Sequence, residues 1–267
     1  MSPEHSIVLQ TNELLTLTPG PPQIAISEDR YVVRFAQTPA ELDAVLKLRF
    51  EVFNLELQEG LDASFQTGRD RDEFDATCHH LMLIDQETNT VVGTYRLHTS
   101  EIARLGFYSA GEFDLTHLPV EVLNQSVELG RACIADAHRS QKALFLLWKG
   151  LVAYMRLYRK RYLFGCCSLT SLDPSEGKAV MQLLAEGCHF HEEFHVPPQK
   201  DFVCFDEGFV AQPRATAKIP KLFRTYLRYG AKVCGEPAID RLFKTIDFFV
   251  IFDLAALDAL SRVFFGV

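Results

Sequence analysis

The sequence has no long hydrophobic run, although 48% of its 267 residues are hydrophobic. No apolar stretch approaches the roughly 18 residues that a membrane-spanning helix needs. The N-terminus also lacks the basic-then-apolar order of a secretory signal. We therefore expect a cytoplasmic protein, and a chain of this length is long enough for one large folded domain.

Regular cysteine spacing is missing as well. The seven cysteines show no paired spacing, which indicates free thiols in a reducing compartment. Neither a glycine-rich nucleotide loop nor a serine in the nucleophile-elbow pattern occurs. Residues 191–195 read His-Glu-Glu-Phe-His and match the zinc-protease string, but Gly187 and Pro197 leave little room for the helix that this motif requires. We expect no metal site.

Acidic residues are absent from two segments of an acidic chain. The formal net charge of -8 argues against nucleic-acid binding. Residues 137–172 nevertheless contain seven Lys or Arg, and residues 211–235 contain six, with no Asp or Glu in either segment. Two interpretations stay open at this point. The segments are solvated faces, or they bind an acidic partner or the anionic surface of a membrane from its periphery.

The clearest pattern in the chain is a strand followed by a helix. Residues 126–134 alternate like a strand, and residues 143–160 place apolar side chains at spacings of three and four, which is typical of a helix with one face in the core. The connector, residues 135–142, then precedes the first turn of the helix, where free backbone N–H groups favour an anion. The sequence thus predicts a strand, an anion-binding turn and a core-facing helix.

The remaining patterns predict one mixed α/β (α+β) domain over residues 28–267, preceded by a tail over residues 1–27 that is rich in proline near its end. Thr38, Pro39 and Glu41 have the residue types and spacing of a helix N-cap, first turn and capping box. A later helix is expected to begin after Asp173 and end near Gly187. The other predicted strands are residues 31–36, 80–85, 91–98, 162–168, 202–209 and 247–253.

Six charged residues occupy positions at which an apolar or small residue would be expected. Burying a lone charge costs several kcal/mol, on the order of 3 or more, unless a partner neutralises it. Several converging charges favour a functional site, whereas a buried ion-pair network without chemistry is the alternative. The six residues are Arg49, Asp72, Asp75, Arg96, Glu128 and Arg131.

The motifs that contain these residues resemble a known family. They are Leu48-Arg49, Asp72-Glu73-Phe74-Asp75, Gly93-Thr94-Tyr95-Arg96, Glu128-Leu129-Gly130-Arg131, Phe164-Gly165-Cys166 and Asp247-Phe248-Phe249-Val250. Over about residues 30–255 the chain resembles the ornithine N-acyltransferase branch of the GNAT superfamily, which is related to acyl-homoserine-lactone synthases and N-acyl amino acid synthases. The resemblance implies a GNAT fold with a mixed central sheet flanked by helices.

The resemblance also implies an activity. Enzymes of this branch move a long fatty acyl chain, with or without a 3-hydroxyl group, from acyl carrier protein to the α-amine of ornithine and form lyso-ornithine lipid. Two other functions stay open. One is transfer to another amino acid or amine, and the other is a non-catalytic, lipid-binding protein with the same fold.

The turn before the central helix departs from the acetyl-CoA enzymes of the superfamily. Those enzymes have the pattern R-x-x-G-x-G or A, where this chain reads Arg139-Ser140-Gln141-Lys142-Ala143-Leu144. Without the glycines the backbone cannot approach a pyrophosphate closely, which favours the acyl-phosphopantetheine of acyl carrier protein, with its single phosphodiester, as the donor. We expect Arg139 and Lys142 to bind this donor, and no permanently bound cofactor.

The expected catalytic residue is Glu128, which would take a proton from the α-amine directly or through a water. Arg49 and Arg131 would hold carboxylates of the substrate or of the site, and Asp75 could hold a cationic side chain. The full set of expected substrate-binding residues is Arg49, Asp72, Asp75, Arg96 and Arg131.

Glu128 and Arg131 share one site only if their strand is irregular. Residues three apart in a regular strand point to opposite faces. A β-bulge at Gly130 would turn both charges toward one cleft and would separate the strand from its neighbour. We therefore predict an irregularity between Leu129 and Ala132.

Overall fold

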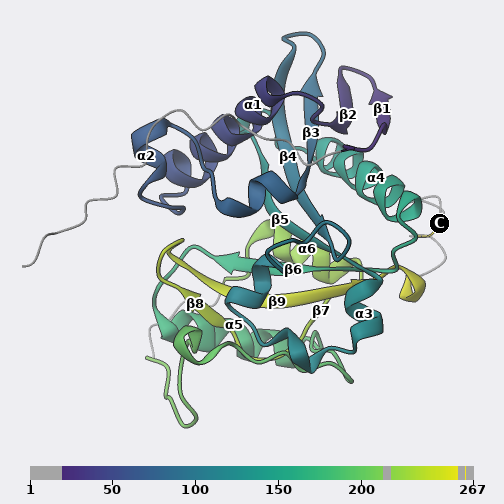
Figure 1. Cartoon of the computed structure of the whole chain (residues 1–267). Helices are drawn as coiled ribbons and strands as arrows, with labels where there is room; N and C mark the ends of the chain where they lie inside the picture. The colour runs from purple at the N-terminus through teal and green to yellow at the C-terminus, as the bar shows by residue number, and fades with distance from the viewer. Residues whose placement is uncertain (1–19, 213–217, 258–261, 263–267) are drawn as a thin grey trace, which may run out of the picture.

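The fold is built on one twisted sheet of nine strands. The structure, a computed structural model, describes residues 20–212, 218–257 and 262 (Figure 1). Within these residues the sheet has the order β1-β2-β3-β4-β5-β6-β9-β7, with β8 also paired to β9. The strands are β1 (Ala25–Glu28), β2 (Tyr31–Phe35), β3 (His79–Asp85), β4 (Thr90–Thr99), β5 (Ser126–Ile134), β6 (Tyr162–Leu169), β7 (Lys232–Val233), β8 (Ala238–Asp240) and β9 (Thr245–Asp253).

Helices cover both faces of this sheet. Helices α4 and α1 pack on opposite faces of β3, because α4 contacts Leu81 and Leu83 whereas α1 contacts Met82 and Ile84. Helices α5 and α6 pack against β9 through Ile246, Phe248 and Val250, and a loop over residues 107–123 covers its other face. The helices are α1 (Pro39–Phe50), α2 (Ser64–Thr67), α3 (Val120–Asn124), α4 (Gln141–Leu157), α5 (Pro174–Glu186) and α6 (Lys221–Arg228).

Local sequence signals fix the ends of several elements. Thr38 caps α1, its side chain accepts from the backbone N–H of Glu41, and the Glu41 side chain accepts in return from Thr38, which confirms the predicted capping box. Asp173 caps α5, and the helix is followed by Gly187 at its C-cap, as predicted. Strands β3 and β4 form the expected antiparallel hairpin.

Two sequence predictions about elements are wrong or need adjustment. Residues 202–209 form no strand, because one turn of 3-10 helix ends at Phe202 and only an isolated bridge follows, at Val203. The strand β1 lies across the predicted end of the tail at residue 27 and pairs with β2, so ordered structure begins before residue 28. Residues 1–19 of that tail lie outside the described part of the chain.

The sheet is divided between β5 and β6. These two strands are linked by α4 and run parallel. Only three residues of each strand are aligned, from Ser126 opposite Tyr162 to Glu128 opposite Phe164. Beyond Glu128 strand β5 continues along β4 alone, and Figure 1 shows β1–β5 in the upper half of the molecule and β6–β9 in the lower half. The separation leaves a gap between the two halves of the sheet.

None of the helices among the described residues combines the length and the apolar character that crossing a bilayer requires.

Candidate active site

A β-bulge in β5 shapes the gap. Thr94 on β4 pairs with Cys133 and Arg96 pairs with Gly130, so Arg131 and Ala132 together face the single residue Tyr95. The predicted irregularity between Leu129 and Ala132 is therefore confirmed. The left-handed residue in this bulge is Arg131, with φ 48°, which follows Gly130. A long side chain in this conformation is strained, which is frequent at functional sites.

Three arginines and three aspartates form a buried ion-pair network beside the bulge. Arg49 on α1 donates from Nε to Asp70 at 2.7 Å and from Nη1 to Asp75 at 2.6 Å. Arg96 on β4 donates to Asp72 at 2.5 Å and to Asp75 at 3.1 Å. Arg131 completes the network, with its Nη2 at 3.0 Å from Asp72 and its Nε at 3.3 Å from Asp70.

The arginines of the network lower the pKa values of Asp72 and Asp75. Burial alone would raise the pKa of Asp75, but Arg49 and Arg96 outweigh it and hold this pKa well below its ordinary value. Arg49 and Asp75 are almost completely buried. Neither they nor Asp72 line the cavity described below, whereas Arg96 and Arg131 do. Arg49, Asp72 and Asp75 thus support the two arginines that reach the cavity.

Glu128 is held by three donors from a turn of 3-10 helix over Tyr108–Gly111. The backbone N–H groups of Tyr108 and Ser109 donate to its two carboxylate oxygens at 2.8 and 2.7 Å, and the Ser109 hydroxyl donates at 2.5 Å. The side chain of His98 approaches from β4, with its Nδ1 at 3.6 Å from Glu128 Oε2. Glu128 is only 4% exposed, so these donors replace its water.

A cavity of about 370 Å³ occupies the gap between β5 and β6. Both Glu128 and Arg131 line it, as predicted from the bulge. Tyr95 and Arg96 also line it although they are neighbours on one strand, so the cavity is bordered by both faces of the sheet. On the α4 face the lining is largely apolar and aromatic, and it includes Trp148, Leu151, Val152, Leu163, Tyr226 and Phe252.

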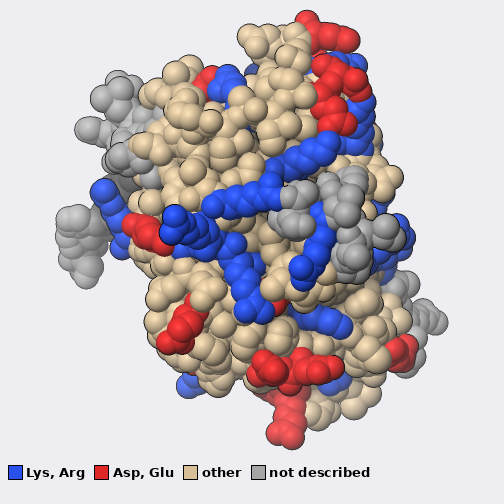
Figure 2. All heavy atoms as spheres, turned by 90° about the vertical axis from the view of Figure 1, so that its right-hand side faces the viewer, with Lys and Arg blue, Asp and Glu red and all other residues tan. Residues whose placement is uncertain are grey.

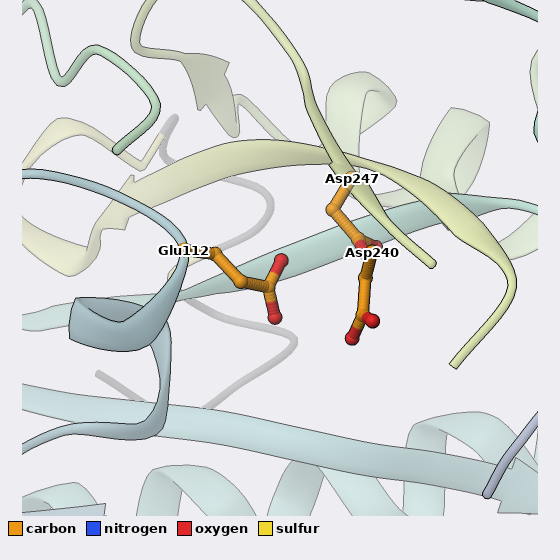
Figure 3. Close-up of side chains that lie close together, drawn as sticks. All are labelled: Glu112, Asp240 and Asp247. Atoms are coloured by element: carbon orange, nitrogen blue, oxygen red, sulfur yellow. The ribbon is translucent and has the colours of Figure 1, made fainter. Parts of the chain in front are cut away.

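On the opposite face the lining is charged, and it contains three clustered carboxylates. Glu112, Asp240 and Asp247 offer oxygen atoms that lie within 4.8 Å of one another, and all three residues are buried. Figure 3 shows the Glu112 side chain reaching from its loop toward the two aspartates of the β8–β9 hairpin. The arrangement suits a cation, either a metal ion or an ammonium group.

Without a cation this cluster retains protons. Burial raises the pKa of Glu112 well above its ordinary value, and the charges of Asp247 and Asp240 raise it further. Burial also raises the pKa of Asp247, although the hydroxyls of Ser168 and Thr245 oppose the shift. Glu59, which lines the same cavity, has a pKa raised by burial to about 7. An incoming cation would therefore displace protons.

Comparison with known proteins places the chain in a family. The model of the acetyltransferase (GNAT) domain matches residues 48–149. The L-ornithine N(alpha)-acyltransferase of Brucella abortus (strain 2308) is 33% identical over 250 residues, which cover 88% of each chain. The chain belongs to the L-ornithine N(alpha)-acyltransferase family. It is an acyltransferase with a GNAT fold.

Two more distant proteins are similar to this acyltransferase. The L-ornithine N(alpha)-acyltransferase of Agrobacterium fabrum (strain C58 / ATCC 33970) is 29% identical over 246 residues, covering 87% of this chain and 84% of the relative. Among solved structures, FeeM, an N-acyl amino acid synthase from uncultured soil microbes, matches with a TM-score of 0.48 at 12% identity, covering 88% of this chain and 98% of FeeM.

The residues expected to bind the acyl donor lie at the start of α4, as the sequence indicates, but both are engaged. Arg139 is exposed and forms a two-pronged pair with Glu56, and its Nε donates to the carbonyl of Ile134 at 2.8 Å. Lys142 pairs with Asp29. Neither residue lines the cavity. Arg139 and Lys142 could therefore bind the acyl donor only after they release Glu56 and Asp29.

The string at residues 191–195 is not a helix, in agreement with the sequence analysis. His191 Nδ1 accepts from the backbone N–H groups of Glu193 and Phe194 and so closes a turn. The sequence did not predict the acidic cluster of this acyltransferase, although Asp247 belongs to one of the motifs that carry the family resemblance. An acidic residue next to Phe248 and Phe249 in a buried strand was the available signal.

Proposed function

We propose that the protein transfers a long-chain acyl group from the phosphopantetheine of acyl carrier protein to the α-amine of ornithine, forming lyso-ornithine lipid. The observation that carries this proposal is the single cavity in the divided sheet, which is apolar on one face and charged on the other. Such a cavity accommodates a fatty acyl chain and an amino acid together. The names of the two bacterial relatives supply ornithine as the acceptor.

The donor would enter from the α4 and α6 face. The aromatic and aliphatic side chains on this face match an acyl chain and the arm that carries it. Figure 2, which views the right-hand side of Figure 1, shows a band of lysines and arginines across the middle of the molecule. Acyl carrier protein is acidic, so a basic band beside the apolar lining favours it as the donor. Exposed basic residues on the two helices are Lys142, Arg156, Lys221, Arg224 and Arg228.

The acceptor would bind on the charged face. Arg96 Nη2 has no hydrogen-bond partner among the described residues, and it is therefore available for the α-carboxylate of an amino acid. Glu112, Asp240 and Asp247 would bind the ammonium group at the end of the ornithine side chain. Both assignments place the α-amine between the arginine and the acidic cluster, close to the bulge.

The proposal is tested with purified protein, palmitoyl acyl carrier protein and single amino acids, with the product identified by mass spectrometry. L-ornithine should yield N-palmitoyl-ornithine acylated at the α-nitrogen. L-norvaline has the same carbon chain without the terminal amine and is the matched control acceptor. Its kcat/KM should be at least about 100-fold lower, because the acidic cluster then stays unpaired. The variant Asp247→Asn should reduce this preference for ornithine.

Three results would contradict all or part of the proposal. Absence of N-acylated product with every amino acid and amine tested would remove the catalytic function and favour lipid binding alone. Equal kcat/KM for ornithine and norvaline would show that the acidic cluster does not select the acceptor, and a requirement for added divalent metal would assign the cluster to an ion instead.

A further inference from the structure

His98 is a buried histidine whose two ring nitrogens have no hydrogen-bond partner among the described residues. It lies on β4 directly opposite Glu128 on β5, and it lines the cavity. The rings of Phe74 and Phe107 contact it edge to face, at centroid distances of 6.3 and 5.9 Å. These aromatic contacts hold the ring in place without using either nitrogen.

The other buried histidines of the sheet are anchored differently. His79 Nδ1 lies 2.9 Å from the hydroxyl of Tyr154, and His80 Nε2 lies 3.0 Å from the carbonyl oxygen of Asp75. Neither residue lines the cavity. Leaving a buried polar atom unpaired destabilises the folded protein. An imidazole that has both nitrogens unpaired at the wall of a cavity is therefore best explained by a ligand that pairs with them.

Glu128 is poorly placed to accept a proton itself. Its Oε1 accepts two hydrogen bonds from Ser109, and its Oε2 accepts one from the backbone of Tyr108. The remaining lone pair on Oε2 is available to His98 Nδ1, 3.6 Å away, a distance that can shorten when a substrate fills the cavity.

Glu112 is another cavity carboxyl that could act as a base. Burial raises its pKa well above the ordinary value, so it is protonated in the absence of a cation. With a cation bound at the cluster, it pairs with that charge. In neither state is it free to remove a proton from a second amine.

We propose that His98 is the catalytic base of the transfer and that Glu128 is a positioning residue, which fixes the tautomer with Nδ1–H toward the carboxylate and leaves Nε2 to face the substrate. The assignment rests on the proposed N-acyltransferase function. In this assignment His98, and not Glu128, is the base, and Glu128 is needed to orient the imidazole.

The proton balance of the step is complete. His98 Nε2 takes one proton from the α-ammonium group, and the amine nitrogen then bonds to the thioester carbon. The C–S bond breaks, and a second proton from the nitrogen neutralises the leaving thiolate. The amide keeps one hydrogen, the phosphopantetheine leaves as a thiol, and the imidazolium returns its proton to solvent.

The charged groups around His98 come from the strands on either side. Glu128 faces it from β5, and His79 on β3 is close enough to interact with it electrostatically. The segments that pack on the ring from other elements contribute the apolar side chains Phe74 and Phe107. Glu128 is therefore the main group that would couple to the protonation of His98.

The test measures log kcat/KM against pH for palmitoyl transfer to L-ornithine. In the wild type we expect an acid limb, because the proposed base acts only as a neutral imidazole. His98→Gln should lower kcat by about 100-fold or more and remove this limb. Glu128→Gln should also lower kcat, and the double variant should be no slower than His98→Gln, because residues that act as a unit are not additive. His79→Gln is the matched control and should keep wild-type activity.

Each outcome is decisive. If the wild type acylates ornithine while His98→Gln keeps near-wild-type kcat and the same acid limb, His98 is not the base. If the wild type forms no N-acyl product, the proposed function itself fails. Should His98→Gln not fold, 15N spectra of histidine-labelled wild type settle the tautomer. A pH-dependent His98 signal with Nδ1–H supports the proposal, and a ring with Nε2–H overturns it.

Discussion

Glu59 offers a direct test of the electrostatics of the cavity. The residue is 6% exposed, and its carboxylate accepts a hydrogen bond from the hydroxyl of Thr170. Burial raises its pKa from 4.5 to about 7, the Thr170 hydroxyl opposes this shift, and the charge of Asp247 adds to it. Glu59→Gln keeps the size and the hydrogen-bonding ability of the side chain but cannot ionise.

The magnitude follows from the two pKa values. Their difference, 7 minus 4.5, multiplied by about 1.36 kcal/mol for each pKa unit, gives about 3 kcal/mol. The folded state of the wild type holds the proton more tightly than the unfolded state. Ionisation therefore lowers the free energy of unfolding as pH rises from about 4.5 to about 7, and the full penalty applies above that range.

Urea unfolding at several pH values measures this penalty. Glu59→Gln should be more stable than the wild type by up to about 3 kcal/mol at pH 8, and the two proteins should converge near pH 4.5. Glu73→Gln, at an exposed position, is the control and should show no such pH-dependent gain. The reasoning is refuted if Glu59→Gln is destabilised at pH 8, or if the difference between the two proteins does not change with pH.

Three further predictions concern the donor and the divided sheet. Because the turn before α4 has no glycine, kcat/KM with palmitoyl acyl carrier protein should far exceed that with acetyl-CoA, and comparable values would contradict the donor assignment. Replacing the exposed residues Arg156, Arg159 and Arg161 with Glu should raise KM for the carrier protein and weaken the salt dependence of the rate, whereas an unchanged KM would favour a solvated face. Gly165→Ala should disrupt folding or push β5 and β6 apart, since its Cβ would lie 2.2 Å from the carbonyl oxygen of Leu129, and a normal melting temperature with full activity would exclude this close approach.

Much of the fold could be predicted from local patterns. The capping residues Thr38 and Asp173 specify helix starts through side-chain hydrogen bonds within a few residues, and these signals do not depend on the tertiary structure. The prediction of a strand over residues 202–209 was wrong because it rested on hydrophobicity alone. Its apolar residues contribute to packing around β9 as irregular chain, and hydrophobicity alone does not distinguish that from a strand.

The site was predicted in part. Charges at apolar positions identified Arg96, Glu128 and Arg131, which the fold brings to one cavity. The same signal could not show that Arg49 and Asp75 neutralise each other, because ion pairing depends on the distance between α1 and the segment before β3. His98 has no distinctive sequence signal, since a histidine in a strand is usually an ordinary core residue. Only the tertiary structure separates it from His79 and His80, because each of those residues has one paired ring nitrogen whereas His98 has none among the described residues.

Both faces of the sheet border the cavity, and this affects the order in which the two substrates bind. Tyr95 and Arg96 point to opposite sides and both line the gap, so two reactants can approach it by separate routes. Neither then blocks the other, and neither must leave before its partner enters. Initial-rate plots for a donor and an acceptor that meet in this way intersect, as a ternary complex requires. Parallel lines would instead indicate a covalent acyl-enzyme.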